Sequence, residues 1–357
     1  MKRMFVAVIA VVMAAALCVG LAACGGGGSS SSTTGGSSES SGGGGESGGA
    51  ASTEGIGVAY ASALDPNDVA DQFGLAEAGA DVETLNEDSA VVAGLNRGSI
   101  EVGNVDYDAA VSAVAEGLPI KIIYISQTTP EYQFVANPEI KTIADLAGKK
   151  VGYQEPGSQT EIFAENIVKE EAPQIYDEVE FIALAESSRR AQAMVAGQLD
   201  ASPLETINLA QLEEQGGYHS LAKWSDLSGA AKEALGTAWI TTDEDYEKNK
   251  AKLQAFVEDL QKGYNEAYAD EAAWLSLAEE TLSEVETKLL PAVYKVYVGE
   301  NMYPKSGKPA ITPSIFKAND SFWRSLGEWE KPVSDEMVAF DLVEAGSKVT
   351  AKASAEG

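Results

Sequence analysis

Short apolar runs alternate with amphipathic helical segments along much of the chain, and this alternation constrains the fold more than any other feature. Each run is four to six residues long, and most are followed by a segment in which apolar residues recur at helical spacing. Strand–helix repetition of this kind predicts α/β units with a mostly parallel sheet and helices on both faces. The predicted strands are Ile56–Tyr60, Asp81–Leu85, Ile100–Val105, Ile120–Ile125, Lys150–Gln154, Val179–Leu184, Gln198–Ser202 and Trp239–Thr242.

The helices between these runs carry recognisable start and stop signals. Asp65 and Pro66 open the first helix, and Gly79 and Gly98 are expected to end the first two. From Asp243 onward the chain is predicted to be mostly helical. Apolar residues at helical spacing there are expected to belong to the core, namely Leu253, Phe256, Val257, Leu260, Tyr264, Tyr294, Tyr297, Phe322, Trp323 and Trp329.

The first 53 residues have no place in this series. Residues 1–23 are organised as a secretory signal peptide, with Lys2 and Arg3 before an apolar segment and LAA at its end. The phrase LAAC resembles the lipobox of bacterial lipoproteins, and this resemblance predicts lipidation of Cys24. Residues 24–53 are almost entirely Gly, Ser, Thr, Glu and Ala, a composition that favours a disordered tether with a reach of roughly 30 Å.

Charge and cysteine content disfavour several classes of function. The chain carries 25 Lys and Arg against 55 Asp and Glu, whereas nucleic acid and anionic membrane surfaces require a basic partner. Removal of the signal peptide leaves Cys24 as the single cysteine, so an exported fold without a disulfide must depend on a large core. One histidine, His219, and no cysteine cluster argue against a transition-metal site, and no cofactor is expected.

Six segments of the predicted folded part come in a characteristic order. They are DPNDVADQFGLAEAGADVETL, AGLNRGSIEVGNV, AVAEGLPIKIIY, IKTIADLAGKKVGY, MVAGQLDA and WITTDEDYEKNKAKLQAFVEDL. This series resembles the taurine, aliphatic-sulfonate and nitrate type of solute-binding protein of ABC importers, the NMT1-like proteins. The most specific parts are DLAGKKVGY before a Gly-Ser turn and the paired phrases LNRGSIEVG and VAGQLDA. The resemblance covers about residues 55–261.

The resemblance implies a two-lobed α/β fold of the type II periplasmic-binding-protein class. Lobe 1 would consist of residues 54–138 and 239–357, and lobe 2 of residues 139–238. Each lobe would hold a mixed, mostly parallel sheet flanked by helices, with a helical C-terminal region. The ligand would lie in the cleft between the lobes, beyond the carboxyl ends of the strands, and the lobes would close around it.

Strand ends in lobe 1 supply three candidate ligand-binding residues. Tyr60 ends the first strand, where its ring can pack on a ligand or cap the core. Asp106 and Tyr107 follow the third strand at the corresponding edge. Asp108 directly precedes a helix and is expected to be its N-cap, which leaves Asp106 available to face the cleft.

In lobe 2 the stretch VGYQEPGSQTEIF places a turn before a helix N-terminus, which can bind an anion. Ser158 and Glu161 have the spacing of a capping box, which explains both residues without a ligand. A capped helix end can still present backbone N–H groups to an anion. Because the resemblance places a ligand-binding turn here, Gly157, Ser158, Gln159 and Thr160 are predicted to contact the ligand.

Glu205 follows the predicted strand 198–202 and suits an ammonium group of a ligand. Acids also favour the first turn of a helix, which would explain Glu205 without a ligand. Similar proteins often have an aromatic–acid–proline phrase here, of which this chain keeps the acid. Arg189 and Arg190 open the preceding helix; this is unfavourable for the helix dipole and suggests an anion nearby, although a surface position is the simpler interpretation.

Together these features predict a lipid-anchored solute-binding protein on the extracytoplasmic face of the cell membrane. It would capture a small charged solute, either a zwitterion such as taurine or an organic anion, and deliver it as a monomer to an ABC permease without catalysing a reaction. One alternative is an enzyme, since pyrimidine synthases of thiamine synthesis share the fold. Those enzymes use a cysteine-rich motif, a histidine and a lysine-bound pyridoxal phosphate, whereas the mature chain has one cysteine and one histidine. A surface lipoprotein without a transport role is the other alternative.

Overall fold

The computed structural model describes residues 52–61, 64–85, 87–156, 158–282 and 285–350. All of these residues belong to one compact unit, Gly49–Gly357. The predicted signal peptide, Cys24 and nearly all of the predicted tether therefore lie outside the described part of the chain. No helix in that part is both long enough and apolar enough to cross a membrane.

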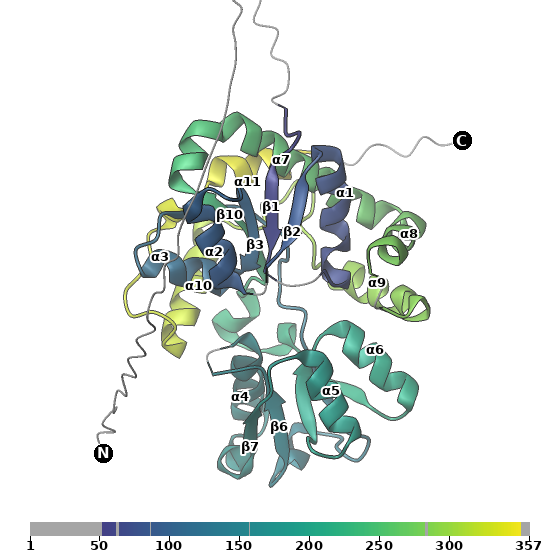
Figure 1. Ribbon diagram of the computed structural model, residues 1–357. Helices are drawn as coiled ribbons and strands as arrows, with labels where there is room; N and C mark the ends of the chain where they lie inside the picture. The colour runs from purple at the N-terminus through teal and green to yellow at the C-terminus, as the bar shows by residue number, and fades with distance from the viewer. Residues whose placement is uncertain (1–51, 62–63, 86, 157, 283–284, 351–357) are drawn as a thin grey trace, which may run out of the picture. The chain divides into compact units, whose positions relative to one another are not determined.

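The first sheet has five strands in the order β2-β1-β3-β10-β4 (Figure 1). β1, β2 and β3 are parallel, whereas β10 runs antiparallel to both β3 and β4, so one of the five strands is reversed. The strands are β1 (Gly57–Tyr60), β2 (Asp81–Thr84), β3 (Val102–Asp106), β4 (Ile120–Ile125) and β10 (Thr237–Thr242).

The second sheet repeats this arrangement in the order β7-β6-β8-β5-β9. β6, β7 and β8 are parallel, and β5 runs antiparallel to β8 and β9. In each sheet the reversed strand is fourth in the order, and it is the first strand after the chain crosses from the other sheet. The strands are β5 (Gln133–Ala136), β6 (Lys150–Tyr153), β7 (Glu180–Ala183), β8 (Ala201–Leu204) and β9 (His219–Lys223).

Helices flank both sheets and dominate the C-terminal region. Those of the first sheet are α1 (Val69–Ala78), α2 (Asp88–Arg97) and α3 (Tyr107–Ala115). Those of the second sheet are α4 (Gln159–Glu171), α5 (Ser187–Val195) and α6 (Thr206–Gln215). The C-terminal helices are α7 (Asp243–Ala269), α8 (Glu271–Thr281), α9 (Leu290–Gly299), α10 (Pro313–Leu326) and α11 (Phe340–Ser347). Short 3₁₀ turns are η1 (Pro66–Asp68), η2 (Ile143–Leu146), η3 (Pro173–Glu178), η4 (Trp224–Asp226), η5 (Gly229–Glu233), η6 (Thr287–Leu289) and η7 (Asp335–Met337).

Two glycines allow the closest helix contact of the first lobe, between α1 and α7. A Cβ atom on Gly74 would lie 2.5 Å from the Cα of Leu260, and one on Gly263 would lie 2.5 Å from the backbone nitrogen of Gly74. The two backbones therefore approach to a distance that leaves no room for a side chain at either position. This contact fixes the long helix α7 against α1, the helix that connects β1 and β2.

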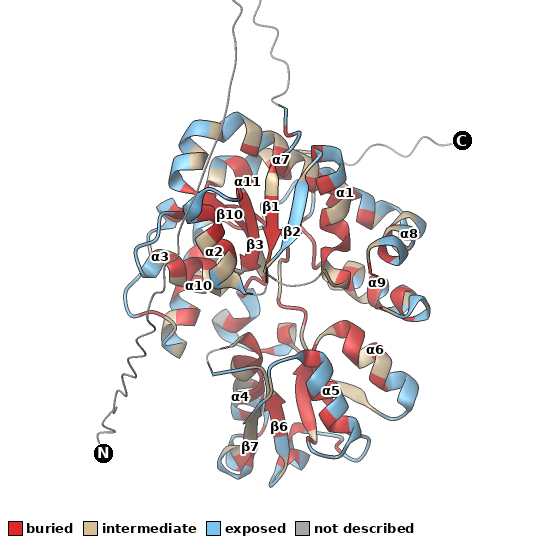
Figure 2. Ribbon diagram, viewed as in Figure 1, coloured by how far each residue is buried: buried red, intermediate tan, exposed pale blue. Residues whose placement is uncertain are grey.

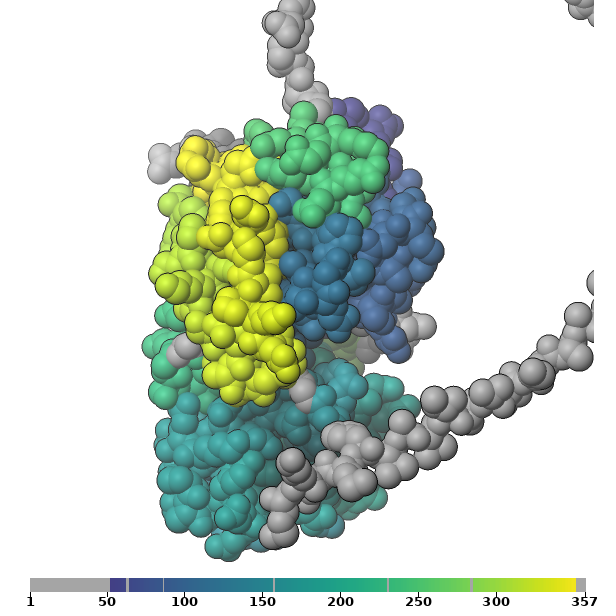
Figure 3. Space-filling model, turned by 90° about the vertical axis from the view of Figure 1, so that its left-hand side faces the viewer, coloured from purple at the N-terminus to yellow at the C-terminus, as the bar shows by residue number. Residues whose placement is uncertain are grey.

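The core follows the pattern of the sheets. β1 and β3 are almost entirely buried, whereas β2, an edge strand, is exposed along its whole length (Figure 2). The apolar stripe of α7 is buried, as are the five aromatic residues after α7 that were expected in the C-terminal core, namely Tyr294, Tyr297, Phe322, Trp323 and Trp329. α11 packs on α7, where Figure 3 shows the yellow end of the chain beside the green segment. These expectations are confirmed.

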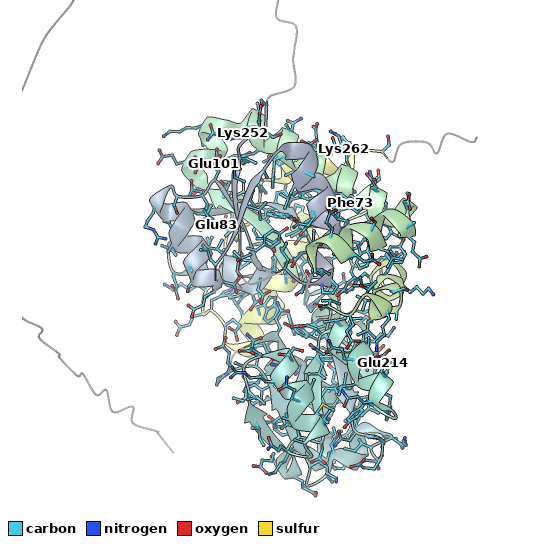
Figure 4. All side chains as sticks on the ribbon, turned by 45° about the vertical axis from the view of Figure 1, so that its right-hand side comes forward. Phe73, Glu83, Glu101, Glu214, Lys252 and Lys262 are labelled. Atoms are coloured by element: carbon cyan, nitrogen blue, oxygen red, sulfur yellow. The ribbon has the colours of Figure 1, made fainter. Side chains whose placement is uncertain are left out.

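Polar contacts attach the C-terminal helices to the rest of the unit. Lys252 of α7 donates to both carboxylate oxygens of Glu101, at 2.8 and 2.9 Å, at the end of β3 that is opposite to Asp106 (Figure 4). Asn319 of α10 accepts a bond of 3.1 Å from the backbone N–H of Leu235 and donates one of 2.8 Å to the carbonyl of Glu233. α10 thereby holds the segment before β10, in which the chain crosses back from the second sheet to the first.

The two-lobed α/β fold expected from the sequence is confirmed, with differences in detail. β5 and β9 were not predicted, because QFVA is very short and HSLAK has no apolar run. β8 begins at Ala201, later than the expected Gln198. The strand pairing puts the two crossings before Gln133 and before Thr237, a few residues upstream of the expected lobe boundaries at 138 and 238.

Candidate functional site

A cavity of about 630 Å³ lies at the carboxyl ends of the parallel strands, and residues from both sheets line it. This is the edge at which open α/β sheets bind their ligands, and the volume is typical of a small-molecule site. Four of the predicted ligand-binding residues are part of its lining, namely Tyr60, Asp106, Gln159 and Glu205.

Tyr60 is held rigidly at the end of β1. Its hydroxyl donates to Asp71 at 3.2 Å and accepts from the side-chain amide of Gln72 at 3.3 Å. The edge of its ring packs on Trp239, with ring centroids 5.5 Å apart. Asp71 also accepts a bond of 2.6 Å from Tyr264, and burial raises the pKa of Asp71 to about 7. Tyr60 therefore both caps the core and lines the cavity.

Asp106 ends β3 beside two further carboxylates, Asp88 and Asp108. Its backbone N–H donates to Asp88 at 3.2 Å. Burial, followed by the charges of Asp88, Asp108 and Glu205, raises the pKa of Asp106 well above its usual value, and burial raises the pKa of Asp88 to about 6. Asp106 thus occupies the cavity wall, as predicted from its position at a strand end.

Asp108 does not cap α3 as expected, because the helix begins at Tyr107 and Asp106 takes the N-cap position. Asp108 lies in the first turn and accepts a bond of 2.7 Å from the side-chain amide of Gln159. Gln159 opens α4 of the second sheet, so this bond joins the two lobes at the rim of the cavity. Tyr107 is fully buried in the core cluster, away from the cavity lining.

The turn before α4 is stabilised by its own side chains. Ser158 is the N-cap of α4 and accepts from the backbone N–H of Glu161 at 3.3 Å, so the capping role predicted for Ser158 is confirmed. Thr160 is fully buried and accepts from the backbone N–H of Gln154 at 2.8 Å. Gln154 and Glu155 line the cavity, whereas Gly157 lies outside the described residues.

Glu205 lines the cavity at the end of β8, near another buried carboxylate, Glu131. Burial and the charge of Glu131 raise the pKa of Glu205 to about 7, although the positive charge of Arg190 opposes the shift. Glu131 accepts bonds from the hydroxyl of Tyr297 at 2.7 Å and from the amide of Asn67 at 3.2 Å. Burial nevertheless raises the pKa of Glu131.

Arg190 is 1% exposed and lines the cavity, so the surface position favoured from the sequence is wrong for this residue. Its guanidinium group donates to the backbone carbonyls of Leu184, Ala185 and Pro203, at 3.0, 2.6 and 3.3 Å. Arg189 is exposed and pairs with Glu186 at 3.1 Å. Helical spacing alone could not predict which of the two arginines is buried, because this depends on the backbone carbonyls that the second sheet places near Arg190.

Several lining residues were missed, among them Gln127, Asp88 and Glu131. Gln127 follows β4 at the same edge as Asp106, so the strand-end rule that identified Asp106 could have identified it. Asp88 opens α2, and Glu131 lies in the first crossing segment, where no local pattern marks a ligand contact. Asp65 and Asp68 also line the cavity; burial raises the pKa of each well above its usual value.

The lining is suited to binding a polar solute. Its described members include neither histidine nor cysteine nor lysine, so they offer no pairing of a nucleophile with a basic residue of those types. Within the described ranges, no three His, Cys, Asp or Glu residues are placed to hold a metal ion. Carboxylates, amides, hydroxyl groups and the guanidinium group of Arg190 are the polar groups of the lining; the hydroxyls belong to Tyr60, Tyr132, Ser187, Ser188 and Thr237.

Comparisons with known proteins agree with this architecture. A family model described as NMT1/THI5 like matches residues 69–273. The periplasmic aliphatic sulphonate binding protein SsuA from Escherichia coli is similar in structure, with a TM-score of 0.63 and 18% identity over 80% of this chain and 91% of that chain. The alkanesulfonate-binding protein SsuA from Xanthomonas axonopodis pv. citri, bound to MOPS, has a TM-score of 0.60 and 18% identity over 81% and 99% of the two chains.

A mutant of DSZB in complex with biphenyl-2-sulfinic acid is also similar, with a TM-score of 0.62 and 13% identity over 82% of this chain and 99% of that chain. No curated protein sequence gives a significant match. At these identities, the likeness to solved structures establishes the two-lobed fold, and the ligand must be inferred from the cavity itself.

Proposed function

The chain belongs to the NMT1/THI5-like family, whose model covers more than half of it, and we propose that it is a solute-binding protein of an ABC importer. The observation that carries this proposal is the cavity of about 630 Å³ formed by strand ends of both sheets. A ligand that contacts both lobes there would stabilise their closure. The solved SsuA proteins, which bind sulfonates, share the fold and support the same role.

We propose further that the protein acts outside the cytoplasm, anchored through a lipid on Cys24, and hands its solute to a membrane permease as a monomer. The LAAC phrase and the Gly/Ser-rich residues 25–53 support the anchor and the tether. The strongly acidic composition would keep the folded part soluble near a membrane. The described lining supports capture of a polar solute, because carboxylates, amides, hydroxyls and Arg190 are its polar groups.

The solute should be small and should carry at least one positive charge. Glu205 was predicted to suit an ammonium group and Asp106 to face the cleft, and both line the cavity. Taurine, the ligand suggested by the family resemblance, has such a group. Its sulfonate would have to find a partner at the N-terminal turn of α4 or at Arg190.

Isothermal titration of the purified full-length chain tests the proposal. The panel should contain taurine, alkanesulfonates, betaines, nitrate and simple amines. We expect saturable binding of one solute per chain, with an affinity tighter than millimolar for at least one compound. Absence of such binding for the whole panel would refute a solute-binding role for this cavity.

A further inference from the structure

The cavity is far more acidic than the rest of the chain. One basic residue, Arg190, accompanies nine carboxylates among the described lining residues, whereas the whole chain has 25 basic and 55 acidic residues. The nine carboxylates belong to Asp65, Asp68, Glu87, Asp88, Asp106, Glu131, Glu155, Glu186 and Glu205. The acidity of the cavity is therefore a local property and does not simply follow from the composition.

A second cavity, of about 280 Å³, makes the contrast clear because it lies along the same crossing segment. Glu131 and Tyr132 line both cavities. Four lysines line the second cavity and none lines the first, among the residues that the structure describes. The four are Lys223, Lys232, Lys305 and Lys308. The positive charge of these lysines thus lies close to the acidic cavity in the fold but outside its lining.

The protein supplies little countercharge inside the acidic cavity. In the described part of the chain, the one salt bridge of a lining carboxylate joins Glu186 to Arg189, and both of these side chains are largely exposed. Arg190 directs its guanidinium group at three backbone carbonyls. Buried carboxylates without a positive partner are costly to ionise, so the site is electrostatically incomplete.

A buried amide gives independent evidence that a ligand completes the site. Gln127 is 4% exposed and lines the cavity, and its side-chain nitrogen has no hydrogen-bond partner among the described residues. Asn67, which also lines the cavity, has a buried side-chain oxygen to which no other group in the described part of the chain donates. Buried polar atoms are nearly always bonded in folded proteins, and the orphan nitrogen of Gln127 requires an acceptor atom.

The arrangement of the carboxylates favours an organic ion over a metal ion. Within the described residues no three acidic, histidine or cysteine side chains converge closely enough to hold a metal, although nine carboxylates surround one cavity. We propose, on the basis of the solute-binding role, that the ligand is a small organic amine with a net positive charge and at least one hydrogen-bond acceptor. The carboxylates neutralise its ammonium groups, and Gln127 donates to its acceptor. A sulfonate group, which adds negative charge, is disfavoured.

A series of compounds of similar size but different net charge tests the sign of the ligand's charge. The probes are 1,3-diamino-2-propanol, ethanolamine, taurine and ethanesulfonate, titrated into the full-length chain by calorimetry at pH 8 and low ionic strength. We expect affinity to fall in that order, with ethanolamine at least tenfold tighter than taurine and no saturable binding of ethanesulfonate. Addition of salt should weaken the binding of the cations.

The outcomes separate this inference from the proposed function. Taurine or ethanesulfonate binding more tightly than ethanolamine would overturn the cationic ligand and leave solute binding intact. Absence of saturable binding for these probes and for the wider panel of sulfonates, betaines and nitrate would overturn both. Tighter binding of cations that persists unchanged in the Glu205→Gln variant would show adhesion to the acidic surface and would also overturn the inference.

Variants test the two contacts directly. Glu205→Gln should weaken binding of 1,3-diamino-2-propanol at least tenfold, whereas Glu139→Gln, which removes the same charge from an exposed position, should not. To test the contact between Gln127 and a hydrogen-bond acceptor of the ligand, the affinity for 1,3-diamino-2-propanol is compared with that for 1,3-diaminopropane, which lacks the hydroxyl group. The preference of the wild type for the hydroxyl compound should disappear in Gln127→Met. An unchanged preference in a variant with a wild-type circular dichroism spectrum would refute the role of Gln127.

Discussion

Replacement of Glu205 by glutamine should stabilise the ligand-free protein at pH 8 but not at pH 5. The pKa of Glu205 is raised from 4.5 to about 7 by burial and by Glu131, so the folded chain holds this proton more tightly than the unfolded chain does. The stability that the protonated form confers is fully present below about pH 4.5 and is lost as the pH rises through about 7. Glutamine mimics the protonated form at every pH.

The magnitude follows from the two pKa values. Between pH 5 and pH 8 the wild type should lose about 2–3 kcal/mol of unfolding free energy through this one group, a loss that Glu205→Gln avoids. For a folded unit of this size, the melting temperature of the variant should exceed that of the wild type by about 5 °C at pH 8. At pH 5 the two proteins should melt within about 2 °C of each other.

Thermal unfolding followed by circular dichroism, with the full-length chain in dilute detergent, measures this difference. Titrating groups that do not face Glu205 change equally in both proteins and cancel in the comparison. The groups that face Glu205 and are retained are Asp65, Asp68, Asp106, Glu131, Tyr132 and Arg190. Glu139→Gln should show no such dependence on pH. An equal effect of Glu205→Gln at both pH values would show that Glu205 is already ionised without cost and would refute the reasoning.

Three further predictions concern other parts of the molecule. Cation binding should displace protons from the carboxylates, so the affinity for 1,3-diamino-2-propanol should rise at least tenfold between pH 5 and pH 8. Calorimetry in two buffers of different ionisation enthalpy would detect the released protons. An affinity that does not change with pH would contradict the raised pKa values. Gly74→Ala should cost about 1–3 kcal/mol of unfolding free energy, since its Cβ would meet the Cα of Leu260 at 2.5 Å; a melting temperature equal to that of the wild type would show that α1 and α7 separate easily. Cys24→Ala should move the protein from the membrane to the soluble fraction of cells, and retention in the membrane would refute the lipid anchor.

Much of the fold could be predicted because its elements carry local signals. Asp65 at the N-cap of η1 and Gly79 and Gly98 at the ends of α1 and α2 are found where the sequence placed them. The strands β5 and β9 could not be found in this way, since their pairing depends on each other and on β8 rather than on their own composition.

From the residues themselves, the candidate site was predictable mainly where a residue ends or follows a strand; Gln159 was found through the family resemblance. Asp106 and Glu205 satisfy that rule and line the cavity, whereas Tyr107 satisfies it and is buried in the core. One position along a helix turns the side chain by about 100°, so a strand end fixes the neighbourhood but not the direction of the side chain. Arg190 and Glu131 belong to the site through tertiary contacts alone, which no spacing in the sequence records.

The reversed strands explain why the crossing segments form part of the cavity wall. β4 ends at the cavity edge of the first sheet, and β5, being reversed, begins at the cavity edge of the second; β9 and β10 repeat this relation on the return. The crossings can therefore be short, spanning residues 126–132 and 224–236. Gln127, Glu131 and Gly236 in these segments line the cavity. A ligand that bonds to Gln127 and neutralises Glu131 would thus act on the segments that connect the lobes, so that binding and closure would be coupled through the same residues.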